Sequence, residues 1–97
     1  MFRRMEKIDE LIKRLLGEII LKNFEFLLGS LVTINKVKTD QNLKETKIYL
    51  NVFPVEKAER VFNLLNKKTS FFQKMLAEKL SFRSLPKIKF ILNLGFE

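Results

Sequence analysis

The chain contains neither cysteine nor histidine among its 97 residues. Without cysteine there is no disulfide framework and no thiolate metal site, a composition that fits a reducing cytosol. With histidine missing as well, the two commonest ligands of transition metals are absent. The Cys–His and Ser–His–Asp nucleophile systems are excluded for the same reason. We therefore expect no metal, no cofactor and no enzymatic activity.

Glycine and proline are scarce too, with three and two residues. The glycines are isolated, so neither a GxxxxGKS/T nor a GxGxxG phosphate loop exists. No apolar run approaches the roughly 20 residues of a membrane span. Charged residues interrupt the stretch between Ile8 and Leu21, unlike the core of a signal peptide. We expect a cytoplasmic protein with no membrane partner and no small-molecule substrate.

What the chain does contain describes a folded, basic protein. Hydrophobic residues make up 46% of it and ten residues are phenylalanine, which rules against disorder. A length of 97 residues is that of one domain, and we assign residues 1–97 to a single unit. The formal net charge is +8, and a strongly basic domain usually meets a polyanion.

The positive charge is concentrated between residues 66 and 89. Seven of the eight charged side chains there are basic and only Glu78 is acidic, which gives this stretch a net charge of +6. A localised basic stretch indicates a nucleic-acid partner. The competing interpretation is a solvated face that keeps a small protein soluble, although such surfaces ordinarily mix both signs.

Apolar spacing predicts three helices. Steps of three and four between Ile8 and Ile20 give one amphipathic helix. A second helix follows Pro54, which suits a helix start, and is interrupted at residues 66–69. Ser70 and Gln73 have the form of a capping box with Ser70 as N-cap, so a third helix should begin there. Its expected core face consists of Phe71, Phe72, Met75, Leu76 and Leu80.

Three strands are also expected. Residues 31–39 are rich in β-branched side chains, and Val37 falls out of phase with Val32 and Ile34, which indicates a bulge. Residues 40–42 form a polar turn. The next strand alternates cleanly from Thr46. One face of this strand consists of Thr46, Ile48, Leu50 and Val52, and the other of Lys47, Tyr49, Asn51 and Phe53. A third strand follows Pro86, and its apolar face consists of Ile88, Phe90, Leu92 and Leu94.

The predicted order is therefore α-β-β-α-α-β. The first two strands form an antiparallel hairpin. A right-handed crossover through two helices places the third strand parallel to the second. We expect an α+β fold with a three-stranded mixed sheet and helices packed on one face, an arrangement that resembles a type II KH domain and makes this a KH-like chain. The usual KH domain carries a GxxG loop between its paired helices, and this chain has none.

Candidate RNA-binding residues lie along the basic stretch. Lys67 and Lys68 sit at the predicted helix break, beside the amides of a helix N-terminus, which attract phosphate. Arg83 has an alternative role, which is only to fix the turn before Pro86. Tyr49 can either stack on a base or cover the sheet. The full candidate set is Lys67, Lys68, Ser70, Lys74, Lys79, Arg83, Lys87 and Lys89.

Two segments resemble the ribosome-binding factor A family of bacterial small-subunit assembly factors. One is the hairpin, with LVTINKV at 31–37 and NLKETKIYLNV at 42–52. The other is LSFRSLPKIKF at 80–90. The helix junction departs from the family pattern, because Lys68-Thr69-Ser70 stands where the family has Ala-x-Gly, and Gln73 stands in the place of an arginine. Thr46 replaces an alanine.

The resemblance implies a monomer that binds the immature 30S subunit and its 16S rRNA, assists maturation of the rRNA 5′ end and supports growth after cold shock. It implies no catalysis, and a GTPase partner in some bacteria. Two other interpretations stay open at this point: a general KH-like module for single-stranded RNA, and a protein-interaction domain that uses the sheet face around Tyr49.

Overall fold

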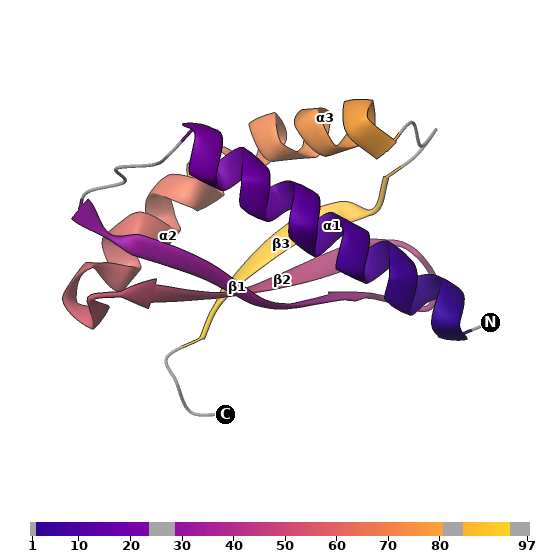
Figure 1. The fold of residues 1–97 in the computed structure, drawn as a ribbon, viewed down its shortest axis with the longest axis horizontal. Helices are drawn as coiled ribbons and strands as arrows, with labels where there is room; N and C mark the ends of the chain where they lie inside the picture. Colours follow the sequence, from indigo (N-terminus) through magenta and orange to yellow (C-terminus); the bar gives the residue numbers. More distant parts are fainter. Residues whose placement is uncertain (1, 24–28, 81–84, 94–97) are drawn as a thin grey trace.

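The computed structural model describes residues 2–23, 29–80 and 85–93. The elements follow the predicted order, with a short 3-10 helix added before the second α-helix (Figure 1). They are α1 (Phe2–Asn23), β1 (Leu31–Thr39), β2 (Glu45–Phe53), η2 (Val55–Lys57), α2 (Ala58–Lys67), α3 (Thr69–Leu80) and β3 (Lys87–Leu92).

The three strands form one mixed sheet in the order β1-β2-β3. Strand β1 runs antiparallel to β2, and β3 runs parallel to β2, as predicted. The hairpin turn is closed by two backbone hydrogen bonds, from Asp40 N to Glu45 O and from Leu43 N to Asp40 O, each 2.9 Å long. The polar turn therefore extends two residues beyond its predicted end.

A bulge in β1 confirms the change of phase seen in the sequence. Ile34 pairs with Leu50, but the next pair is Lys36 with Tyr49, so Asn35 is the extra residue. Because of this insertion, Ile34 and Val37 are both buried on the same side of the sheet although they are three residues apart. The residues on either side of the bulge can therefore serve one core.

In the described part of the chain, the helices pack on one face of the sheet. Figure 1 shows α1 running along the sheet with α3 beside it. Alternate residues of β2 from Thr46 to Val52 are buried beneath the helices, and Lys47, Tyr49 and Asn51 lie on the other face. We call this second face the open face.

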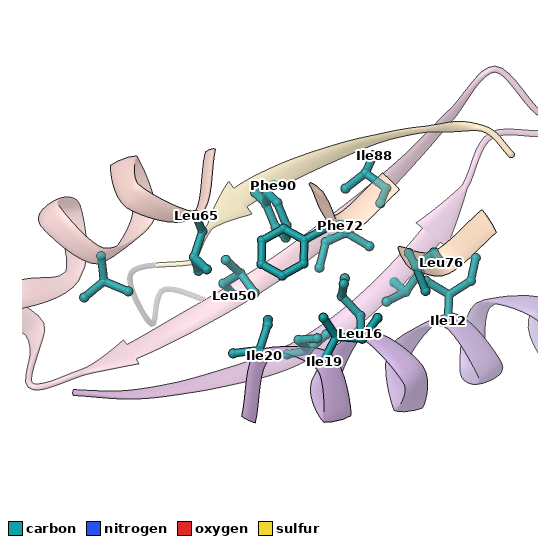
Figure 2. Packing of buried hydrophobic residues seen from close by; sticks show 14 of the residues in the cluster. Ile12, Leu16, Ile19, Ile20, Leu50, Leu65, Phe72, Leu76, Ile88 and Phe90 are labelled. Carbon is teal, nitrogen blue, oxygen red and sulfur yellow. The ribbon is translucent and has the colours of Figure 1, made fainter. Parts of the chain in front are cut away.

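The core is built from the apolar stripes of all three helices and the covered face of the sheet. Phe72 of α3 lies edge-on to Phe90 of β3, with ring centroids 5.5 Å apart. Figure 2 shows the two rings in the cluster that also contains Leu50 of the sheet and Leu16 of α1. Edge-to-face rings contribute beyond the area that they bury, so this pair joins α3 firmly to the last strand.

Of the five residues expected on the core face of α3, Phe71 is exposed, and Met75 and Leu80 are only partly buried against the core. Phe71 is 37% exposed, whereas Phe72 and Leu76 are fully buried. Adjacent residues of a helix point about 100° apart, so both phenylalanines cannot occupy the centre of one stripe. Phe72 is aligned with Leu76 four residues later, whereas Phe71 lies on the side of exposed Lys74 and Glu78. The prediction of Phe71 as core was wrong for this reason.

Helix α1 is tied to the end of the hairpin by a hydrogen-bonded chain of three side chains. The Thr39 hydroxyl donates to Asp9 Oδ1 at 2.6 Å, and Thr39 N donates to Asp9 Oδ2 at 3.3 Å. The Thr39 and Thr46 hydroxyl oxygens are 3.0 Å apart. A hydroxyl has one proton, and that of Thr39 is directed to Asp9. Thr46 is therefore the donor to Thr39.

This chain makes Thr39 the central member, and a matched pair of substitutions tests that role. Thr39→Val should cost about 1–3 kcal/mol, since it leaves the buried Thr46 hydroxyl without its acceptor and Asp9 without two-point contact. Thr46→Val has the same change in shape but leaves the Thr39–Asp9 bond intact, and should cost less, about 0.5–1.5 kcal/mol. Urea unfolding of both variants measures the difference. A larger loss for Thr46→Val would contradict the assigned order of donors.

Some sequence-based predictions fall on residues outside those described. They concern Arg83 and Leu94. Among the described helices, none is both long enough and apolar enough to cross a bilayer.

Candidate nucleic-acid interface

The junction between α2 and α3 consists of one residue, Lys68. Its N–H donates to Leu65 O at 3.0 Å in the last turn of α2, and its carbonyl accepts the N–H of Phe72 at 3.1 Å to begin α3. The same residue therefore ends one helix and starts the next. The side chains of Lys67 and Lys68 are both exposed here, as expected for a basic helix break.

The predicted capping box does not form. Helix α3 begins at Thr69, so Ser70 lies inside its first turn and is not the N-cap. Thr69 instead donates its hydroxyl proton to Asn66 O at 2.6 Å, which satisfies a carbonyl at the end of α2. The local pattern was interpreted correctly as a helix start, but the residue before the helix is Lys68, so the predicted cap was displaced by two residues.

The side chain of Gln73 connects α3 to the start of β3. Its Nε2 donates to Pro86 O at 2.8 Å and to Leu85 O at 3.4 Å, and its Oε1 accepts the N–H of Ile88 at 2.9 Å. These partners are 12 to 15 residues away in the chain, so no local pattern identifies them. Sequence reasoning missed this role because it assigned the same amide to a cap.

Gln73 holds one wall of an open groove between α3 and β3. The groove has a volume of about 550 Å³. It brings together three of the predicted RNA-binding residues, Ser70, Lys74 and Lys87. Its lining consists of Thr69, Ser70, Gln73, Lys74, Ala77, Leu85, Lys87 and Ile88.

The groove and the junction are positive in sign. Of the described residues that line the groove, the charged ones are Lys74 and Lys87, both basic. The first turn of α3, which starts at Thr69, lies at one end of the groove. The first N–H groups of a helix have no partner within it and carry the positive end of the helix dipole, an arrangement that binds phosphate. The arrangement is suited to holding a nucleic-acid backbone.

The remaining candidates lie outside the groove lining. Lys79 is exposed near the end of α3, and Lys89 is exposed on the open face of β3. The structure thus divides the described candidates into three groups. Lys79 lies alone near the end of α3, Lys89 lies on the open face, and the others lie at the junction or in the groove, namely Lys67, Lys68, Ser70, Lys74 and Lys87. Among the described residues, no group of three or more acidic side chains is placed to hold a metal ion.

Comparison with known proteins gives consistent matches along the chain. The family model for ribosome-binding factor A matches residues 4–97. A ribosome-binding factor A from Akkermansia muciniphila is 32% identical over 93 residues, covering 96% of this chain and 74% of that protein. The crystal structure of ribosome-binding factor A from Thermus thermophilus gives a TM-score of 0.79 at 23% identity, covering 91% of this chain and 93% of that one.

A further structural match comes from the same organism. It is a homology model of the Thermus thermophilus ribosome-binding factor A, fitted into a cryo-EM map of its complex with the 30S subunit. The TM-score is 0.71 at 23% identity, and the match covers 91% of this chain and 93% of that one. At this level of identity the two structures show a shared fold.

Proposed function

Because the chain belongs to the ribosome-binding factor A family, we propose that it is an assembly factor that binds the immature 30S subunit through its 16S rRNA. The observation that carries the proposal is the family match over residues 4–97. The Thermus thermophilus relative has been fitted into a 30S complex, and we extend that partner to this chain.

The α2–α3 junction and the α3–β3 groove support an RNA partner. They supply exposed lysines, the N-terminus of α3 and a groove with no acidic lining among the described residues. We propose that residues 1–97 act as one KH-like rRNA-binding domain, monomeric and cytoplasmic, with no cofactor and no catalytic step. Assistance to maturation of the rRNA 5′ end and to growth in the cold belongs to the same proposal.

Within this proposal Lys67, Lys68 and Ser70 contact one stretch of rRNA backbone, and Lys74 and Lys87 contact its continuation along the groove. Lys79 and Arg83 are proposed as further contacts. Phosphate contacts of this kind set the position of a protein on its nucleic acid, while base contacts supply specificity. The groove lined by Ser70, Lys74 and Lys87 is where a base edge would be read.

Co-sedimentation with purified ribosomal subunits tests the function. We expect the protein to pellet with small subunits and not with large subunits, and to favour immature small subunits with an unprocessed rRNA 5′ end over mature ones. The measurement is made at two salt concentrations, because nonspecific attraction to RNA weakens steeply as salt rises.

A competitor separates the other functions. A general single-stranded RNA module would be displaced from subunits by an unrelated RNA oligonucleotide, whereas the proposed factor should remain bound. Equal recovery with small and large subunits would mean that charge attraction alone accounts for binding. Recovery with neither, at both salt concentrations, would favour a protein-interaction domain.

A further inference from the structure

The sheet register places three lysines in a straight row across the open face. Lys47 of β2 is the direct partner of Lys38 on β1 and of Lys89 on β3. In an antiparallel pair such as Lys38 and Lys47, directly opposite side chains have Cβ atoms only about 4.5–5.5 Å apart, and like charges in that position are destabilising. A row of this kind opposes folding stability, so solubility alone does not explain it.

The rest of the open face has the same sign. Among the described strand residues of this face, five of the six charged side chains are lysines, and the exception is Glu45, which is paired with Lys87. The five are Lys36, Lys38, Lys47, Lys87 and Lys89. A mixed surface would balance these charges, and this one leaves a net charge of +4 for a polyanion to neutralise.

An aromatic ring lies next to the row. Tyr49 is two residues beyond Lys47 on the same face and is paired with Lys36 and with Ile91. The Lys36 ammonium is 5.6 Å from the Tyr49 ring centroid, within the range of a cation–π contact. Tyr49 is only partly buried. The face thus offers a ring with a cation beside it, on the central strand of a basic sheet face.

We propose that the open face is a second RNA-binding surface, on which Lys38, Lys47 and Lys89 hold phosphates and Tyr49 stacks on an unpaired base. Single-stranded nucleic acid is bound elsewhere by this combination of a basic track with aromatic platforms. An acidic protein segment would use the lysines but would leave the ring without a specific role. The inference rests on the proposed function in taking RNA as the natural partner.

This surface is separate from the junction and groove. Lys38 and Lys47 are on the face of the sheet opposite to the helices, whereas Lys67 ends α2 and Lys68 links it to α3. Lys87 is the residue that lies both in the groove lining and on the open face. A strand of RNA held in the groove can therefore continue past the edge of β3 onto the sheet.

The test is a titration of a labelled single-stranded RNA at several salt concentrations. Removing two phosphate contacts in Lys38→Gln with Lys47→Gln should lower the slope of log affinity against log salt by about 1.4, at about 0.7 for each contact on a single strand. Its matched control is Lys7→Gln with Lys22→Gln, which removes the same charge from exposed positions of α1 and should leave the slope nearly unchanged.

Two further variants address the ring and the fold. Tyr49→Leu, which keeps an apolar cover on the sheet, should weaken binding about tenfold, and Tyr49→Phe should bind like wild type because stacking on a base needs only the ring. The double lysine variant should melt at the same temperature as wild type or higher, because it relieves repulsion between neighbouring charges. When the Lys38→Gln, Lys47→Gln pair is combined with Lys67→Ala and Lys68→Ala, the two changes in the salt slope should add, because effects at separate sites are additive.

An unchanged salt slope in a folded Lys38→Gln, Lys47→Gln variant would overturn the proposal, and so would an equal change in the α1 control. If this double variant bound RNA like wild type but had lost the ability of wild type to bind a polyglutamate peptide, the open face would be assigned to an acidic protein instead. If wild type failed to select small subunits, the proposed function would be wrong but this inference would still stand, because the titration measures binding to free RNA. If wild type selected small subunits but the open-face variants bound free RNA like wild type, this inference would be wrong and the proposed function would still stand.

Discussion

Replacing Leu50 or Phe90 by alanine should lower the free energy of unfolding by about 2–5 kcal/mol. Leu50 is 0% exposed in the central strand, and Phe90 is 3% exposed with its ring against Phe72. Each truncation removes apolar contacts and leaves a cavity between the sheet and the helices, which close-packed neighbours fill only in part. Domains of this size have a total stability of roughly 5–15 kcal/mol, so either change is severe.

Thermal and urea unfolding of both variants measures this loss. Leu31→Ala is the matched control, because Leu31 is also a strand leucine but is 65% exposed, and its truncation should stay within about 0.5 kcal/mol of wild type. Wild-type melting of Leu50→Ala would mean that the buried face of β2 has been assigned to the wrong residues.

The second large effect concerns RNA affinity. The double variant Lys67→Ala with Lys68→Ala should bind rRNA more weakly and with a flatter dependence on salt. Each lost phosphate contact lowers the slope by about 0.7–0.9, so two contacts together account for roughly 1.4–1.8. Stability should change little, since both side chains are exposed and the junction is held by the backbone of Lys68.

A binding titration at several salt concentrations, with a melting curve for each form, measures both quantities. The exposed α1 pair Lys7→Ala with Lys22→Ala controls for the general loss of positive charge. A folded junction variant with an unchanged salt slope would show that the lysines at the junction do not contact phosphate, and would leave the open face as the main RNA surface.

The fold followed from the sequence because its determinants are local. Alternation in β2, the three-and-four spacing of the helices and the phase change at Val37 each reflect which side chains meet the core. The partners of Gln73 could not be predicted in the same way, since they are backbone groups of a distant segment. The error at Phe71 arose because two adjacent aromatics gave no means of choosing the centre of the stripe.

The site was predicted less completely than the fold. Composition located the basic stretch, and the helix break placed Lys67 and Lys68 correctly at an exposed junction. The row formed by Lys38, Lys47 and Lys89 depends on two registers, one of them shifted by the bulge at Asn35. A pairing register is a property of two strands together, so no single segment contains it. The structure also gives a role to Thr46, which replaces an alanine of the family pattern, because its hydroxyl donates a hydrogen bond to Thr39.

The one-residue link between α2 and α3 limits how this region can change over time. An α-helix turns about 100° per residue, so an insertion or deletion beside Lys68 would rotate Phe72 and Leu76 away from the core. The link therefore tolerates exchange of residue types but not a change of length. By the resemblance described above, Lys68-Thr69-Ser70 stands where the family has Ala-x-Gly, which is a difference of residue type without a difference of length.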